Sequence, residues 1–296
     1  MKKAFAQLHI AVFLAGFTGV LGKLIQLNEG LLVWYRLLFS IVLLAAIALY
    51  KKEFKQISRS DFFQIAGVSM ILAFHWVAFY GSIKYANASV AVVCISAAGF
   101  FSSLFEPVIT GKKFVWVEMF LGLLSLLGIY IIFDFHPQYK TGIIFGIVAA
   151  VGSAIFPIYN KKLLHKFSPQ VLTFYEFVGG LIFLTFLLPL YFVCFGKPDY
   201  YIPDLADLFW LLVLCIFCTV LAFQLQLNAL TKISAFTSNL TYNLEPLYGI
   251  VLAFVILGEG KTLHPQFYYG LLLIVAAVSI QMIRVYLQSK IIENQS

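Results

Sequence analysis

Long apolar stretches separated by short polar connections dominate this 296-residue chain. Ten of the stretches reach the roughly 20 mostly apolar residues that a helix needs to cross a bilayer. We place them at approximately 6–26, 31–50, 63–83, 87–110, 114–133, 142–160, 170–194, 207–229, 234–257 and 266–287. A helix satisfies its own backbone hydrogen bonds in lipid, where water is absent. The pattern therefore predicts an all-α integral membrane protein with ten transmembrane helices.

The composition supports lipid as the solvent for much of the chain. Hydrophobic residues make up 62% of the sequence and charged residues 11%. An average soluble domain has roughly 45–50% and about 25%, respectively. The net charge of +7 comes from cations in short connections between apolar stretches, so it does not indicate a nucleic-acid partner.

The positions of the cations predict the orientation of the chain. If the N-terminus is cytoplasmic, the loops on that side hold fourteen Lys and Arg residues against five on the other side. The remaining cation, Arg36, falls inside a predicted helix. Because cytoplasmic loops carry an excess of positive charge, we expect both termini to be cytoplasmic. The expected location is the bacterial inner membrane.

The chain contains an internal repeat. Three pairs of segments match at offsets of 147, 148 and 140 residues: YGSIKYANASVA (80–91) with LNALTKISAFTS (227–238), Gly122 with Gly270 inside similar apolar runs, and VWYRLLFSIVLL (33–44) with TFYEFVGGLIFL (173–184). We therefore predict two five-helix halves, 1–138 and 139–296. An odd number of helices gives the halves opposite orientations, and such inverted repeats are a basis for alternating access in transporters.

The two halves resemble the drug/metabolite transporter superfamily, in particular its ten-helix EamA-type members. The resemblance is carried by the small-residue junctions 81–88 and 228–235, and by the run from Asn243-Leu244-Glu245-Pro246 through Leu257-Gly258-Glu259 to Gly270. The first half departs from this pattern, because Ala98 aligns with Glu245 and Lys112 follows Gly111 in place of the Gly-Glu turn. The resemblance implies export or uptake of small metabolites, often amino acids.

Glu245 is the strongest candidate for a functional residue within the membrane. Ionisable groups at bilayer depth are costly and usually face a cavity or pair inside the bundle. Glu245 shares a polar stripe with Tyr242 at helical spacing, and Asn239 and Asn243 form an adjacent stripe. A cavity wall is the functional interpretation. A polar seam between helices, with Glu245 protonated and bonded to a neighbour, is the structural alternative.

Other polar residues also fall inside predicted helices. Arg36 and Glu176 occupy matching positions of the two halves, so they are candidates for opposite mouths of one pathway or for snorkelling to the interface. His75 and Trp76 lie midway along the third helix, where they suit a cavity wall or, for a lone histidine, a packing contact. The amides Gln224, Gln226 and Asn228 are further candidates on the eighth helix.

We therefore predict a secondary transporter, an exporter, for small organic metabolites such as amino acids. It would work by alternating access, with protons coupled through Glu245. The predicted substrate-binding residues are Glu245, Tyr242, Asn239, Asn243, Trp76, His75, Arg36 and Glu176. No metal, cofactor or catalytic residue is expected. The predicted partners are a small solute, the lipid bilayer and protons, and both a monomer and a homodimer remain open.

Two alternatives accompany this prediction. A passive facilitator of the same family would need no coupling ion. A membrane-embedded enzyme acting on lipid-linked substrates is more remote, because the acidic residues are dispersed and the Asp-rich segment 199–207 has no histidine nearby.

Overall fold

The computed structural model describes residues 2–52, 55–111, 113–134, 139–233, 238, 241–242, 244–261 and 265–293. Its α-helices are α1 (Lys2–Leu24), α2 (Glu29–Tyr50), α3 (Arg59–Tyr85), α4 (Ala88–Ile95), α5 (Ala98–Thr110), α6 (Trp116–Asp134), α7 (Lys140–Leu163), α8 (Pro169–Phe195), α9 (Leu205–Val213), α10 (Ala222–Leu230), α12 (Glu245–Leu252) and α13 (Pro265–Glu293). Two π-helical segments, η2 (Leu214–Leu221) and η3 (Ala253–Leu257), and the 3₁₀ turn η4 (Glu259–Lys261) complete the order.

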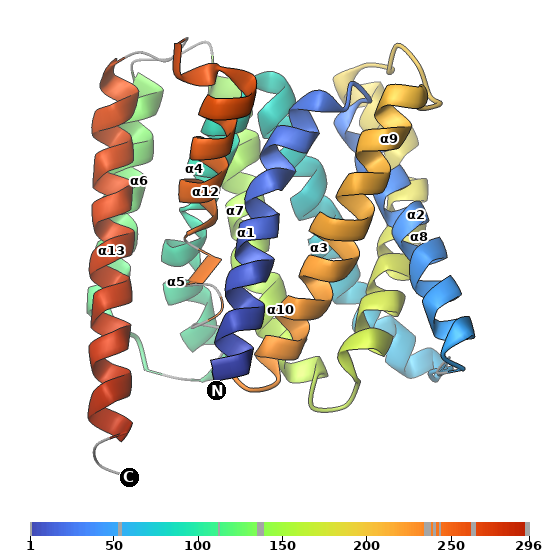
Figure 1. Ribbon diagram of the computed structural model, residues 1–296, viewed down its shortest axis with the longest axis horizontal. Coiled ribbons are helices and arrows are strands. Elements are labelled where there is room, and N and C mark those ends of the chain that lie inside the picture. Colours follow the sequence, from blue (N-terminus) through green and yellow to red (C-terminus); the bar gives the residue numbers. More distant parts are fainter. Residues whose placement is uncertain are drawn as a thin grey trace.

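The helices form a bundle of spans that run up and down (Figure 1). Seven of them are long and apolar enough to cross a membrane within the described residues, and three shorter apolar helices lie at Trp116–Ile131, Glu245–Leu257 and Phe267–Ala277. The ten together correspond to the ten predicted segments. The first helix begins and α13 ends at the same face of the bundle, which we call the terminal face (Figure 1).

The fourth and ninth spans are interrupted at equivalent positions. The first break leaves Ser96 and Ala97 between α4 and α5, and the next helix begins at Ala98. In the ninth span α12 begins at Glu245, which lies 147 residues further on (245 − 98). Both spans end in a glycine with positive φ, Gly111 at 72° and Gly258 at 67°, again 147 residues apart (258 − 111). Pro246 falls in the first turn of α12, where a proline removes no hydrogen bond because the first amides of a helix have no partner within it.

Each half packs its first helix against the other half. The first helix, α1, lies mainly against α10 and α12, and α7 lies against α3, α4 and α5. The equivalent helices α2 and α8 pack on each other, as do α6 and α13, which stand at one end of the bundle in Figure 1. The inverted repeat is therefore interleaved in space.

Small residues permit the close approach of α7 to α3 and α4. A Cβ built at Gly146 would lie 2.5 Å from the Cβ of Cys94, and one at Gly142 would lie 2.5 Å from the Cβ of Ala86. Real Cβ atoms do not approach so closely, so a larger residue would force the helices apart.

Carboxylates tie the helix ends together at the face opposite the termini. Glu259 accepts hydrogen bonds from the amides of Ala88 (3.2 Å) and Ser89 (2.9 Å), so it caps α4 from the other half. Asp207 accepts the amide of Gln26 (2.7 Å) and the hydroxyl of Tyr200 (2.7 Å). Burial and the hydrogen bond to Asp207 raise the pKa of Tyr200, so its hydroxyl keeps the proton that it donates.

Candidate functional site

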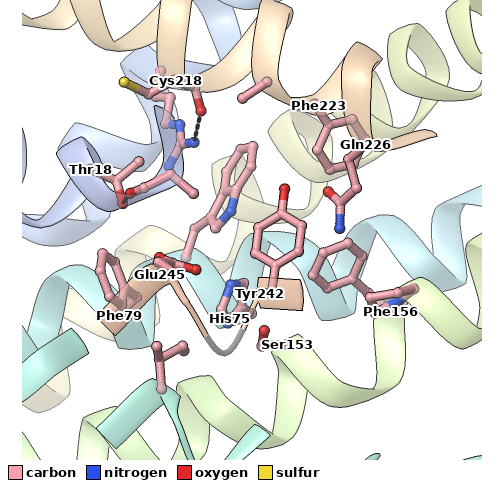
Figure 2. A pocket seen from close by; sticks show the side chains of 16 residues that line it. Thr18, His75, Phe79, Ser153, Phe156, Cys218, Phe223, Gln226, Tyr242 and Glu245 are labelled. Carbon is pink, nitrogen blue, oxygen red and sulfur yellow. Dashed lines mark hydrogen bonds between the residues drawn. The ribbon is translucent and has the colours of Figure 1, made fainter. Parts of the chain in front are cut away.

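One cavity inside the bundle has a volume of about 70 Å³, enough for several water molecules. Helices of both halves contribute to it, and Figure 2 shows their side chains converging on it. Its lining consists of Ala15, Thr18, Arg36, His75, Trp76, Phe79, Ile95, Ser153, Phe156, Pro157, Cys218, Ala222, Phe223, Gln226, Tyr242 and Glu245. Both interrupted spans meet the cavity at their breaks, because Ile95 ends α4 and Glu245 begins α12.

Arg36 supplies a buried and fixed cation. Its side chain is 4% exposed, so it does not snorkel to the interface. The guanidinium donates from Nε to the hydroxyl of Thr219 (2.7 Å), from one terminal nitrogen to the hydroxyl of Tyr80 (2.9 Å), and from the other to the carbonyl of Cys218 (3.2 Å). Its Cζ also lies 3.7 Å from the ring centroid of Trp76, a stacked cation–π contact.

The π-helical segment η2 makes the Arg36 contacts possible. A π-helix shifts the backbone pairing by one residue and often marks a functional site. Within η2, Thr219 donates its hydroxyl to the carbonyl of Leu214 (2.8 Å), which leaves the lone pairs of its oxygen facing Arg36. Apart from small polar residues in an apolar span, nothing in the sequence indicates this segment.

His75 faces the cavity in a defined tautomer. Its Nδ1 lies 2.6 Å from the carbonyl oxygen of Ala149, and a carbonyl can only accept. Nδ1 therefore carries a proton, and in the neutral imidazole Nε2 is then an acceptor. The ring also lies 5.9 Å from that of Phe156.

Glu245 provides the acidic group of the cavity. It is the first residue of α12, where the unpaired amides of a helix start favour a negative charge. Its carboxylate accepts no hydrogen bond from any residue that the structure describes, and no ion pair within 4.0 Å joins it to Arg36. Tyr242 lines the same wall one turn earlier. The cavity thus holds a cation and an acid that are not paired with each other.

Aromatic rings form much of the remaining wall. Phe156 and Phe223 are stacked at 6.2 Å with an interplanar angle of 17°. Phe223 lies 6.4 Å from Trp76 and 5.2 Å from Phe177, measured between ring centroids. Phe177, which packs against Phe223, is the residue next to Glu176 in α8, and neither Phe177 nor Glu176 belongs to the cavity lining.

The structure brings five of the eight predicted residues to this cavity: Arg36, His75, Trp76, Tyr242 and Glu245. Glu176 lies outside the lining, buried against Asn160 of α7. The depth of Glu176 could be read from the sequence, but the direction in which its side chain points could not. Asn239 and Asn243 lie outside the described residues.

Several lining residues were not among the predicted eight. Of the three amides considered on the eighth span, Gln226 lines the cavity, whereas Gln224 donates to Thr173 (2.7 Å). Thr18 and Ser153 are short polar residues in apolar helices, and such residues give little signal in a sequence. Within the described residues, no group of three or more His, Cys, Asp or Glu side chains could hold a metal ion.

Comparison with known proteins supports the family suggested by the repeat. The EamA-like transporter family matches residues 3–134 and 140–283. An uncharacterized transporter of Clostridium kluyveri is 28% identical over 187 residues, or 60% of this chain and 59% of that protein. The uncharacterized transporter YetK of Bacillus subtilis is 27% identical over 272 residues, or 86% and 80%.

A solved crystal structure gives the same fold at low identity. It matches with a TM-score of 0.66 at 15% identity and covers 94% of this chain and 96% of that one. The helical spans, the two matched segments and the central cavity agree with a multi-pass membrane transporter and not with an enzyme. The chain belongs to the EamA-like transporter family of the drug/metabolite transporter superfamily.

Proposed function

We propose that the chain is a secondary transporter that exports small zwitterionic metabolites such as amino acids, with protons coupled through Glu245. The observation that carries this proposal is the presence of Arg36 and Glu245 in one cavity without a bond between them. Arg36 is hydrogen-bonded, but neither it nor Glu245 has an opposite charge within 4.0 Å among the described residues, so each of the two groups favours a solute that brings the opposite charge.

Arg36 suits the carboxylate of such a solute. A guanidinium has five N–H donors, and the three contacts to Thr219, Tyr80 and Cys218 leave two (5 − 3). The stack on Trp76 holds the plane of the group in place. A pre-oriented guanidinium loses little freedom on binding, and a carboxylate can accept two parallel bonds from it.

Glu245 suits the ammonium group of the same solute, or a proton when the solute is absent. The two occupants would compete for one carboxylate, so proton binding on one side of the membrane would displace the solute there. Competition of this kind couples a proton gradient to solute movement. It also explains a single acid in the cavity better than a polar seam does, because a seam needs no ionisable group.

Alternating access would follow from the inverted, interleaved halves and from the two breaks at the cavity. We further propose that the terminal face is cytoplasmic, because the loops on that side hold fourteen cations against five. The membrane would be the bacterial inner membrane.

Flux into proteoliposomes tests the proposal. Purified protein would be assayed with a panel of radiolabelled amino acids, with and without a pH gradient across the vesicle membrane. We expect accumulation against a gradient of solute in the wild type, and exchange without accumulation in Glu245→Gln. Glu118→Gln is the matched control, since Glu118 faces Arg284 (3.4 Å) away from the cavity.

Two outcomes would contradict the proposal. Accumulation by Glu245→Gln at the wild-type rate and pH dependence would exclude Glu245 as the coupling group. Flux of the wild type that does not respond to the pH gradient would indicate a passive facilitator.

A further inference from the structure

Glu176 and Asn160 form a buried polar pair outside the cavity. Both side chains are 0% exposed. Asn160 follows the cavity residue Pro157 by three residues on α7, which is about one helical turn toward the terminal face. Glu176 precedes Phe177, whose ring lies 5.7 Å from that of Trp76. The pair therefore lies one turn beyond the cavity, behind its aromatic wall.

The hydrogen bonds of this pair are incomplete in a specific way. The amide of Asn160 donates to Oε2 of Glu176 at 3.4 Å. The second carboxylate oxygen, Oε1 of Glu176, and the amide oxygen, Oδ1 of Asn160, are both buried and have no partner in the described part of the chain. Both orphaned atoms are acceptors when Glu176 is ionised, so the pair lacks one donor.

No charge compensates an ionised Glu176. Within the described residues its polar partner is Asn160, and no charged side chain acts on it. On the helices packed around it, Arg36 of α2 bonds Thr219, and His75 of α3 bonds Ala149. Asp61 of α3 pairs with Lys166, and Arg59 is the first residue of the same helix. On α7, Lys161 donates to Ile233 and Lys162 to Ile109, and α10 carries no ionisable side chain. A lone carboxylate here would carry a large desolvation cost.

One proton satisfies both orphaned atoms. A neutral carboxylic acid gains an O–H donor on Oε1, which can donate to Oδ1 of Asn160 while Oε2 still accepts the Asn160 amide. The acid and the amide then form a ring of two hydrogen bonds. We propose that Glu176 and Asn160 are a proton-binding site, distinct from Glu245, that holds α7 and α8 together while it is occupied.

Loss of the proton would leave a bare carboxylate that needs water. Water can reach it if α7 and α8 separate on the terminal side of the aromatic wall. The step is balanced, because the acid releases one proton to water and becomes a carboxylate. Deprotonation would thus favour an opening toward the terminal face. This second claim rests on the proposed transport function, whereas the existence of the proton site does not.

Infrared spectroscopy of the purified full-length protein during a pH titration tests the proton site. We expect the carbonyl band of a buried carboxylic acid to vanish in Glu176→Gln and to shift in Asn160→Leu, which removes its hydrogen-bond partner. Glu245→Gln is the control that should retain the band. If Glu176→Gln instead loses a carboxylate band, or if Asn160→Leu leaves every carboxylic-acid band unshifted, the proposal is wrong.

Thermal unfolding supplies a second readout. The amide of Glu176→Gln can donate to Asn160 as the neutral acid does, so this variant should keep the wild-type Tm, and Glu176→Leu should lower it. The double variant Asn160→Asp/Glu176→Gln exchanges acid and amide and should restore the carboxylic-acid band. A Tm for Glu176→Gln as low as that of Glu176→Leu would overturn the proposal. Neither readout requires transport, so both stand even if the transported solute is of another class.

Discussion

The helices that follow the breaks in the fourth and ninth spans begin and end at equivalent positions but carry different chemistry. Helix α5 begins at Ala98 and α12 at Glu245, and each span ends in a glycine with positive φ. Apolar residues such as Ile95 and Ala97 surround the first break, whereas the second break places a carboxylate in the cavity. The repeat therefore duplicates the scaffold without duplicating the site.

The second and seventh spans differ in the same manner. Arg36 and Glu176 occupy matching positions of the repeat, yet Arg36 faces the cavity and Glu176 lies behind its wall. The cation of the cavity thus comes from the first half and the acid from the second, at positions that the repeat does not relate. A cation on one side of the cavity and an acid on the other can bind a zwitterion in a single orientation. Two like charges related by the repeat could not select one orientation.

Removing the cation of the first half should have the largest effect. Truncating one member of a buried, hydrogen-bonded charge pair costs about 2–5 kcal/mol, so Arg36→Leu should lower flux at subsaturating solute by about a hundredfold. Arg36→Lys keeps the charge and loses the fork geometry, and we expect about a tenfold fall. Wild-type flux in well-folded Arg36→Leu would show that the cavity needs no fixed cation.

Moving the carboxylate to the first half tests whether the two breaks are interchangeable. Ala98→Glu combined with Glu245→Ala places the acid at the equivalent position of the repeat. Because Ala98 is buried among apolar residues, we expect flux no higher than that of Glu245→Ala alone. Recovery of pH-dependent flux would mean that the asymmetry is incidental.

Close packing of α7 on α4 should be sensitive to a single methyl group. Gly146→Ala would place a Cβ 2.5 Å from that of Cys94, and overpacking costs about 1–3 kcal/mol. Gly67→Ala on α3 is the control, since a Cβ there has no neighbour within 4 Å. The apparent Tm should fall for Gly146→Ala and hold or rise for the control. An equal response of the two variants would argue against close packing at this contact.

The smallest effect concerns the cap that joins the halves. Glu259→Gln removes the charge that accepts the amides of Ala88 and Ser89, and helix caps contribute about 1 kcal/mol. We expect a Tm lower by about 2–4 °C in thermal unfolding. Glu118→Gln, which affects a partly exposed pair with Arg284, should change Tm less. The reverse order would contradict a capping role.

The sequence predicted the number and order of the spans, because the thickness of the bilayer sets the length of an apolar stretch. It predicted the family from the internal repeat and from the motifs at equivalent positions of the two halves. It also predicted five residues of the cavity, because polar and ionisable side chains in the middle of a membrane span usually face a cavity or a partner inside the bundle. It missed the break at Ser96 and Ala97, where small residues carry no proline signal, and the π-helical segment that frees the Cys218 carbonyl for Arg36. It could not show that Glu176 lies outside the lining of this cavity, since spacing in the sequence does not fix the direction of one side chain against a neighbouring helix.

The packing of α1 has a consequence for how the chain assembles. Its main neighbours, α10 and α12, lie about two hundred residues further along the sequence. During synthesis α1 therefore enters the membrane long before the helices that will enclose it, and contacts of such long range form late. A ribosome that stalls after the seventh span would leave the apolar and small-residue face of α1 exposed to lipid. We therefore expect an incomplete chain to be more sensitive to quality-control proteolysis than one whose ninth span has been inserted.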